Sequence, residues 1–232
     1  MKLDKVIIGN AELWHGDCFE LMAGMADAAV DHVLTDVPYH ANTHKMAKTN
    51  KGKGHGTTLI DFEHITDDQF KALFVEFVRV SRRWVVSTCD LLQAPLLFPL
   101  PEFVRQGVWV KPNPMPQISA DRPGQGYEVV VCLHGEGKKR WNGGGKAGVW
   151  QYPVVNGGVY PTQKPQPLLD RLVADFTDYG ETVLDPCMGS GTTGVAAVQQ
   201  DRKFIGCEAR REAFDIACAR IEAVQAQQRL AL

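Results

Sequence analysis

Residues 182–208, TVLDPCMGSGTTGVAAVQQDRKFIGCE, decide the fold of this chain. The short apolar run from Thr182 to Leu184 predicts a buried strand, and a glycine-rich loop follows it. The stretch from Thr192 to Gln200 predicts a helix, and Lys203 to Cys207 predicts a second strand. A strand, a glycine loop, a helix and a further strand make up the repeating unit of parallel α/β sheets.

The remaining chain continues this alternation of strands and helices. Further strands are expected over residues 11–15, 30–35, 83–88, 104–110 and 128–133. Further helices are expected over 19–25, from Thr66 as an N-cap, after Lys164 through Pro165 and Pro167, and from Arg211. The sequence therefore predicts an α/β fold with a largely parallel sheet, formed by one domain that spans residues 1–232.

Length and composition are those of an ordinary globular protein. The 232 residues can bury a substantial core, and 44% are hydrophobic and 22% charged. We find no signal-peptide pattern and no run of about 18 apolar residues, so a cytoplasmic protein without membrane contact is expected. The six cysteines are scattered, which predicts free thiols. His40 and His44 lack a third ligand at a recognisable spacing, so no metal site is expected.

The charge is distributed unevenly along the chain. A net charge of −2 argues mildly against a nucleic-acid ligand, because DNA binding is driven by basic contacts. However, the glycine- and lysine-rich loop 40–58 has no acidic residue, and the insert 134–160 combines basic and aromatic residues. The basic residues of these two loops are Lys45, Lys48, Lys51, Lys53, Lys138, Lys139 and Arg140. A charge run is usually a solvated face, but this combination also suits nucleic acid.

The glycine loop indicates which ligand the C-terminal half binds. Gly189, Gly191 and Gly194 match the dinucleotide pattern G-x-G-x-x-G, and Glu208 at the end of the next strand can take ribose hydroxyls. Three residues separate Asp185 from Gly189, so the loop is wider than one that lays a pyrophosphate on a helix. A carboxylate at this bend repels phosphate and attracts ammonium, which favours S-adenosylmethionine. An NAD-linked oxidoreductase and a tight packing turn are the alternatives.

The tetrapeptide Asp36-Val37-Pro38-Tyr39 closes an apolar strand and suits the binding of a planar amino group. The amine of a DNA base is a poor nucleophile because its lone pair is conjugated with the ring. Two acceptors for the amine protons and an aromatic ring that stacks on the base assist its reaction. Asp36 offers a carboxylate, Asp36 or Val37 a backbone carbonyl, and Tyr39 a ring, while Pro38 stiffens the turn. By itself, such a tetrapeptide is more often an ordinary turn.

Together, four motifs resemble those of the β-class DNA amino-methyltransferases, which make N6-methyladenine or N4-methylcytosine and have a permuted motif order. DVPY at 36–39 resembles the D/S-P-P-Y catalytic motif of that family. DPCMGSGTTG at 185–194 resembles its cofactor loop, and PTQKP at 161–165 resembles the segment before that loop. HGDC at 15–18 resembles the G-D element that touches the cofactor adenine.

This resemblance implies a Rossmann-like S-adenosylmethionine-dependent methyltransferase fold, with a mostly parallel seven-stranded sheet, helices on both faces and a circularly permuted order. It implies that Asp17 contacts the cofactor adenine and Glu208 the ribose. The residues expected around the methionine end are Thr162, Lys164, Asp185, Gly189, Ser190, Gly191 and Thr192. Cys18 and Gln163 are expected beside the cofactor, and packing is an equal alternative for these two and for Thr162. Asp36, Val37, Pro38 and Tyr39 would hold the target base.

The implied function is site-specific methylation of the N6 amine of adenine in double-stranded DNA, after base flipping. Adenine is favoured because the motif begins with Asp, and the N4 amine of cytosine is the alternative. Val37 replaces the first proline of the family motif, which leaves a DNA- and cofactor-binding pseudoenzyme as a further alternative. Loop 40–58 and insert 134–160 are the expected DNA-contacting and target-recognition segments. A nucleoid-associated location and a homodimer are compatible with the family, and the sequence does not indicate a paired restriction enzyme.

Overall fold

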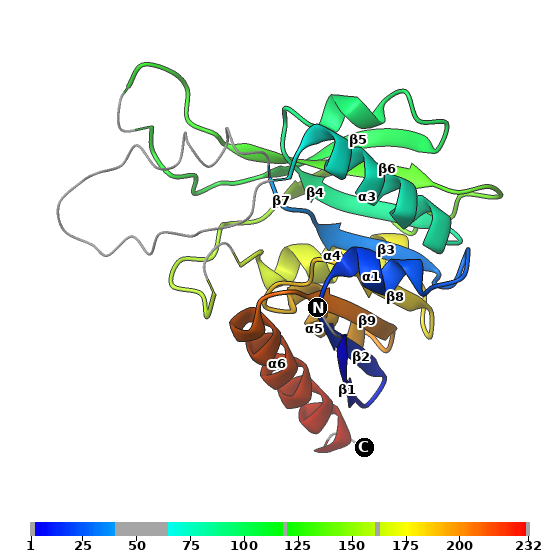
Figure 1. The fold of residues 1–232 in the computed structure, drawn as a ribbon. Helices are drawn as coiled ribbons and strands as arrows, with labels where there is room; N and C mark the ends of the chain where they lie inside the picture. The colour runs from blue at the N-terminus through cyan, green and yellow to red at the C-terminus, as the bar shows by residue number, and fades with distance from the viewer. Residues whose placement is uncertain (1–2, 40–64, 118–119, 161–162, 231–232) are drawn as a thin grey trace.

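The computed structural model describes residues 3–39, 65–117, 120–160 and 163–230 (Figure 1). Its strands are β1 (Asp4–Ile8), β2 (Ala11–His15), β3 (His32–Asp36), β4 (Trp84–Cys89), β5 (Phe103–Val110), β6 (Tyr127–His134), β7 (Val149–Gln151), β8 (Thr182–Asp185) and β9 (Lys203–Glu208). Its helices are α1 (Cys18–Ala23), α3 (Asp67–Val80), the short 3₁₀ helix η1 (Ala94–Leu97), α4 (Gln166–Phe176), α5 (Thr192–Gln199) and α6 (Arg211–Leu230). The predicted α/β class is confirmed.

Within the described residues, the strands form one sheet in the order β1-β2-β9-β8-β3-β4-β6-β5-β7. The five strands from β2 to β4 are parallel, whereas β1 and β6 run antiparallel to their neighbours. The predicted number of seven strands is therefore wrong, because the sheet has nine strands; it is mixed, and five of its eight neighbouring pairs are parallel. The two strands that the sequence analysis missed lie at the two edges of the sheet.

Each missed strand has a physical reason. β1 forms a hairpin with β2 through a turn at Gly9, whose φ of 59° favours glycine. It has an exposed edge and a mostly exposed burial pattern, so no clear alternation of apolar residues marks it. β7 is only three residues long and lies within the glycine-rich segment 134–160, where it pairs with β5. No strand was expected in that segment, and β7 corrects this.

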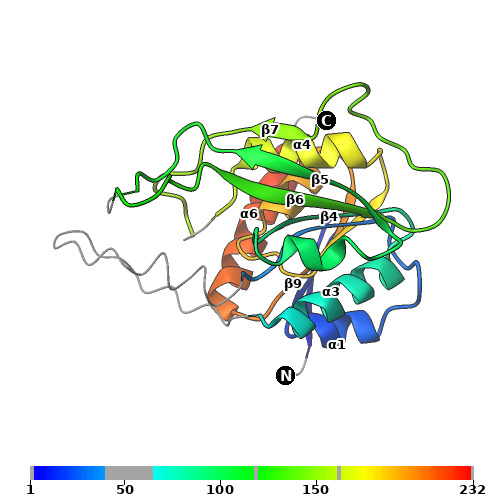
Figure 2. The same cartoon turned by 90° about the horizontal axis from the view of Figure 1, so that it is seen from above.

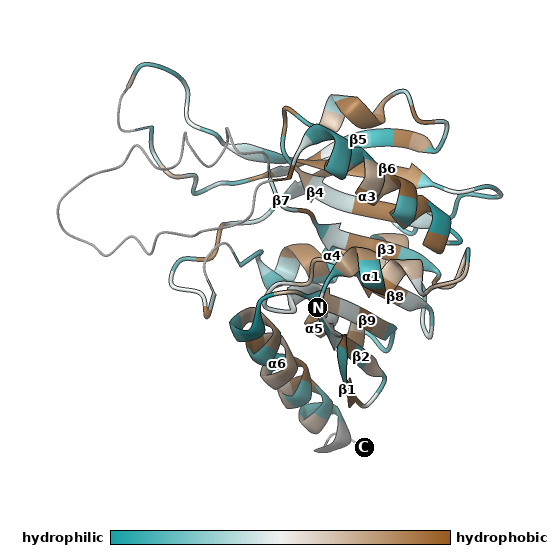
Figure 3. Ribbon diagram, in the orientation of Figure 1, coloured by the Kyte–Doolittle hydropathy of each residue, from teal (hydrophilic) through white to brown (hydrophobic). Residues whose placement is uncertain are grey.

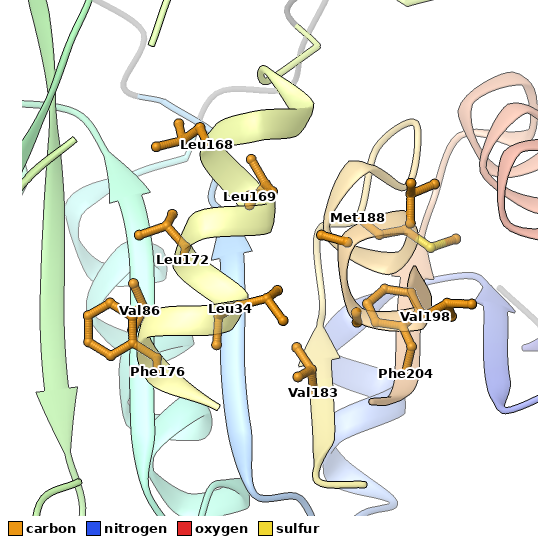
Figure 4. Close-up of a cluster of buried hydrophobic side chains, with 14 of the residues drawn as sticks. Leu34, Val86, Leu168, Leu169, Leu172, Phe176, Val183, Met188, Val198 and Phe204 are labelled. Atoms are coloured by element: carbon orange, nitrogen blue, oxygen red, sulfur yellow. The ribbon is translucent and has the colours of Figure 1, made fainter. Parts of the chain in front are cut away.

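The sheet has a hydrophobic core on each face. Alternating residues of the central strands enter opposite cores, as Val33 and Leu34 of β3 do. Helices α1 and α3 cover one face, and α4, α5 and α6 cover the other (Figure 2). On the second face, Leu168, Leu172 and Phe176 of α4 point toward the strands (Figure 4). Helices on both faces, as predicted, are confirmed.

The helix starts follow local sequence signals. Thr66 caps α3 in a reciprocal capping box with Gln69, as its residue type predicts. α4 begins after Pro165 and carries Pro167 in its first turn. α6 has an apolar stripe of Phe214, Ala217, Ile221 and Val224 toward the core, and its other face is polar (Figure 3). Within the described part of the chain, no helix combines the length and apolar character needed to cross a bilayer.

Candidate active site

A cleft of about 1540 Å³ opens at the carboxyl ends of the parallel strands. It is larger than the roughly 300–1,000 Å³ of a typical small-molecule pocket, so it has room for more than one ligand. β3 and β8 are neighbours at its centre, and the chain leaves them toward opposite faces of the sheet. This is the topological switch point, the position at which open α/β sheets bind their ligands. Asp36 at the end of β3 and Asp185 at the end of β8 line it.

The glycine loop after β8 is shaped for close approach by a ligand. Gly189 has a φ of 50° and Gly191 a φ of 77°, conformations that L side chains rarely adopt. A Cβ on Gly191 would lie 2.8 Å from the Cβ of Ala217, whereas one on Gly189 would meet nothing within 4 Å. The Arg220 guanidinium donates to the carbonyl of Ser190 at 2.6 Å, which fixes the loop from behind. The open side at Gly189 faces the cleft.

Glu208 at the end of β9 is buried beside this loop. Its carboxylate accepts hydrogen bonds from the backbone N–H of Gly189 at 3.0 Å and of Arg210 at 2.9 Å. These two bonds hold both oxygens at the cleft wall, and carboxylate oxygens have further lone pairs for ligand hydroxyls. The Arg210 guanidinium stacks over the Tyr160 ring at 5.2 Å, which forms the adjacent wall.

The Asp185 side chain is buried, so it is not an open surface carboxylate of the kind expected for an ammonium ligand. Its Oδ1 accepts from the Thr35 hydroxyl at 2.6 Å and from the Cys187 N–H at 3.1 Å. Burial raises the pKa of the Asp185 carboxyl to about 7, although hydrogen bonds from Thr35, Thr193 and Cys187 oppose this rise. Asp185 therefore binds β3 to the glycine loop, and its charge changes near neutral pH.

The G-D element lies at the end of β2, beside β9. Asp17 is the N-cap of α1, where its Oδ1 accepts from the N–H groups of Phe19 and Glu20 at 2.8 and 3.1 Å. Cys18 follows it, and a hydrogen bond with the Cys187 thiol lowers the Cys18 pKa despite burial. Both cysteines line the cleft, as Ser190 and Thr192 do. The structure thus brings the two predicted cofactor segments together.

The PTQKP segment is only partly described. Thr162 lies outside the described residues, whereas Gln163 and Lys164 line the cleft. Gln163 Oε1 is buried and has no hydrogen-bond partner among the described residues, so the cleft contains an acceptor available to a ligand donor. Lys164 was expected at the methionine end of the cofactor. In the structure its ammonium instead contacts the DVPY motif, 2.6 Å from Asp36 Oδ2.

Asp36 is held from two sides. The Thr88 hydroxyl donates to Oδ1 at 2.5 Å and Lys164 to Oδ2, yet a third of the side chain is exposed to the cleft. The carboxylate is therefore fixed in orientation and can still accept a hydrogen bond from a ligand. Val37 lines the cleft, and its side chain is 1% exposed and belongs to the core under α3. Valine at this position thus has a packing role.

Tyr39 and Lys164 share a partner that the sequence analysis missed. Tyr39 donates to Glu128 Oε2 at 2.6 Å, and Lys164 lies 3.3 Å from the same oxygen. Lys111 donates to Glu128 Oε1 at 2.5 Å. Burial raises the pKa of Tyr39, and the charge of Asp36 raises it further, so the phenol stays protonated. Glu128 lies on β6, 92 residues from Asp36 in the sequence, and no local motif marks it.

The predicted DNA-binding residues separate into different regions. Lys45, Lys48, Lys51 and Lys53, and His40 and His44, lie outside the described residues. β7 divides the insert 134–160, because it runs parallel to β5 and ends at the cleft. Residues 152–160 therefore border the cleft, and residues 135–148 lie at the opposite end of the strands (Figure 2).

The segment at that opposite end includes Lys138, Lys139 and Arg140, so the structure does not bring them to the cleft. Arg140 donates to Glu181 at 2.7 Å and contacts Asp178 at 2.9 Å. Trp141 and Trp150, two aromatic residues of the insert 134–160, pack against Phe176 of α4. Among the described residues, no group of three or more His, Cys, Asp or Glu side chains is arranged to hold a metal ion.

The fold is a Rossmann-like α/β fold with a large cleft at the carboxyl ends of its parallel strands. A model of the DNA methylase family (N6_N4_Mtase) matches residues 102–219, half of the chain. The chain therefore belongs to the DNA methylase family.

Individual relatives agree with this assignment. The chain is 25% identical to the Type II methyltransferase M2.MboI of Moraxella bovis, over 89% of this chain and 86% of the relative. The solved M1.HpyAVI–SAM complex is 26% identical, with a TM-score of 0.65, over 90% of this chain and 99% of that one. The cytosine-N4-specific PvuII DNA methyltransferase has a TM-score of 0.70 at 15% identity, over 95% of this chain and 93% of that one, which shows a shared fold alone.

Proposed function

We propose that this DNA methylase transfers a methyl group from S-adenosylmethionine to the N6 amine of adenine in double-stranded DNA. One observation carries the proposal. The Asp36 carboxylate is oriented by Thr88 and Lys164 in the same cleft that contains the glycine loop and Glu208. A fixed acceptor for an amine thus lies beside a seat for a nucleoside cofactor.

The residues of the cofactor end fit S-adenosylmethionine. Glu208 would accept from its ribose hydroxyls, and Asp17 from its adenine amine, as the family resemblance implies. The family resemblance implies that Asp185 lies at the methionine end and Gln163 beside the cofactor, and both residues line the cleft. The cofactor supplies an electrophilic methyl group on sulfur.

The target end would activate the amine. Asp36 accepts one amine proton, and the backbone carbonyl of Asp36 or Val37 accepts the other, which turns the nitrogen lone pair toward the methyl group. Tyr39 stacks on the base. The amine carries one proton too many after it has taken the methyl group. The Asp36 carboxylate takes that proton and passes it to solvent.

The assignment of adenine rests on Asp36 at the first position of the motif, and the N4 amine of cytosine is the second candidate. A carboxylate and a carbonyl can hold either exocyclic amine, so the product decides. The base must leave the duplex to reach Asp36, which costs a few kcal/mol of stacking and pairing. DNA contacts are proposed for loop 40–58 and for residues 152–160, which border the cleft.

Product analysis tests the function. The protein is incubated with S-adenosylmethionine and unmethylated DNA of varied sequence, and the nucleosides are identified by mass spectrometry. N6-methyladenine supports the proposal. N4-methylcytosine would retain the mechanism and overturn the base. Cofactor binding without any methylated base would overturn the proposed reaction and favour the pseudoenzyme that Val37 suggests.

A further inference from the structure

Glu128 is the centre of a buried ion cluster to which the family resemblance assigned no role. The cluster consists of Lys111, Glu128, Lys164 and Asp36, together with the Tyr39 hydroxyl. The Glu128 side chain is 15% exposed and has three donors within 3.3 Å, from residues that are distant in the sequence. Its position at the cleft-facing start of β6 brings these donors to the target end of the cleft.

The cluster is electrically balanced. Burial alone would raise the pKa of Glu128, but Lys164 and then Lys111 lower it to about 2. Burial alone would lower the pKa of Lys164, but Asp36 and then Glu128 raise it above its ordinary value. Glu128 and Lys164 are therefore charged at neutral pH. The side chains of Lys111 and Lys164 both contact Glu128, and Lys164 also contacts Asp36.

Glu128 also controls the Tyr39 ring. The hydroxyl oxygen lies on the long axis of a tyrosine ring, so the hydrogen bond at 2.6 Å anchors the far end of the Tyr39 ring and restricts its displacement and tilt. Lys164 lies 5.2 Å from the centre of this ring and 3.4 Å from its hydroxyl. The Lys164 ammonium donates to Asp36 Oδ2 at 2.6 Å and lies 3.3 Å from Glu128 Oε2, so the two carboxyl groups share it.

We propose that Glu128 is a positioning residue for the target base, which anchors the Tyr39 ring through its hydroxyl and shares the Lys164 ammonium with Asp36. This inference rests on the proposed function. Glu128 acts through Tyr39 and Lys164, and it has no contact with the cofactor end of the cleft.

A double-mutant cycle tests the inference. The variants are Glu128→Gln, Tyr39→Phe and the two combined, and Glu136→Gln is the control because it removes an exposed carboxylate beyond the other end of β6. We expect Glu128→Gln to lower kcat by about 100-fold, as small displacements of reacting groups do, with an unchanged Kd for S-adenosylmethionine. The double variant should be no slower than Glu128→Gln, since Glu128 acts through the Tyr39 hydroxyl.

Base stacking gives a second readout that loss of stability would not produce. In DNA with 2-aminopurine at the target position, fluorescence of the flipped base should be less quenched by Glu128→Gln than by the wild type. If Glu128→Gln does not fold, Tyr39→Phe with Glu128 intact should reproduce the loss of quenching. Wild-type kcat and quenching in Glu128→Gln, or additive losses in the double variant, would overturn the positioning role. An inactive wild type would instead overturn the proposed function.

Discussion

Two ion clusters, each built around a glutamate, lie at opposite ends of the strands and have different roles. Lys111 and Lys164 surround Glu128 at the cleft end of the sheet, and Arg140 and His32 surround Glu181 at the opposite end. Cationic or hydrogen-bonding partners lower the pKa of both carboxyls to about 2, against an opposing effect of burial. The chemistry of the two carboxylates is therefore nearly the same.

Their surroundings differ. The partners of Glu128 continue to Asp36 and Tyr39, which line a cleft that can admit a ligand. The partners of Glu181 include the backbone N–H of Asp178, so that cluster joins loops at the amino ends of the strands. An ion cluster supports a reaction where it faces a cleft and supports the fold where it joins chain segments. Substitutions in the cleft cluster should therefore reduce activity, and substitutions in the Glu181 cluster should reduce stability.

The largest effect is expected at the cleft end of the sheet. Asp36→Asn keeps the shape and the bond from Thr88 but weakens the acceptor for the amine and removes the base for its proton. We expect kcat to fall by about 10³-fold, in the range found for loss of one preorganised hydrogen-bonding group. The Kd for S-adenosylmethionine, measured by calorimetry, should change by less than about threefold, because Glu208 and the glycine loop are unchanged. Methylation at the wild-type rate would contradict the role of Asp36.

Asp185 should make the stability of the protein depend on pH. Its pKa is about 7 in the folded protein and about 3.9 in the unfolded chain, so the folded state binds more protons between these values. The contribution is full below pH 4 and is lost as pH rises through 7, by about 4 kcal/mol at most. Urea unfolding should therefore show that Asp185→Asn removes much of the loss between pH 5 and pH 8.

The control for that measurement is Asp68→Asn, which changes a carboxylate that is 98% exposed. It should leave the pH profile of stability as in the wild type. Equal pH profiles for Asp185→Asn and the wild type would show that Asp185 does not titrate in this range.

Glu181→Gln should lower stability and preserve activity. It removes the charge opposite Arg140 in a partly buried cluster, which costs about 2 kcal/mol, below the 3–5 kcal/mol of a fully buried pair. Chemical unfolding at pH 7 measures this loss, and kcat for DNA methylation should remain within about twofold. Because the pKa of Glu181 is lowered, its contribution is present above pH 4.5 and disappears toward pH 2. A kcat reduced as strongly as in Asp36→Asn would contradict the difference in role between the Glu128 and Glu181 clusters.

The smallest effect is expected for Lys138→Glu combined with Lys139→Glu. Both side chains are exposed at the end of the sheet opposite the cleft, so they should not approach DNA whose flipped base occupies the cleft. The Kd for duplex DNA and its salt dependence should change little, whereas each lost phosphate contact would reduce the salt slope by about one. A clear reduction of that slope would restore these lysines to the DNA-binding surface.

The sequence by itself determined much of this protein. The glycine loop, the DVPY motif and the segments around them predicted the α/β class, the family and the cofactor, because close approach to a ligand requires particular residues at fixed local spacings. Most strands of the parallel centre were also predictable, since buried strands are continuous apolar runs. The two edge strands were not, because one is exposed and the other is only three residues long.

The tertiary structure decided what distant residues do together. It placed the Lys164 ammonium against Asp36 instead of at the cofactor end. It also brought four unpredicted residues to the cleft, Glu128, Lys111, Thr88 and Thr35. It moved Lys138 to Arg140 away from the cleft, since β7 divides an insert that looked uniform in the sequence. Local composition determines which groups a segment carries, but strand order and direction determine which end of the sheet these groups reach. A charged residue acquires its role only from its neighbours at that end.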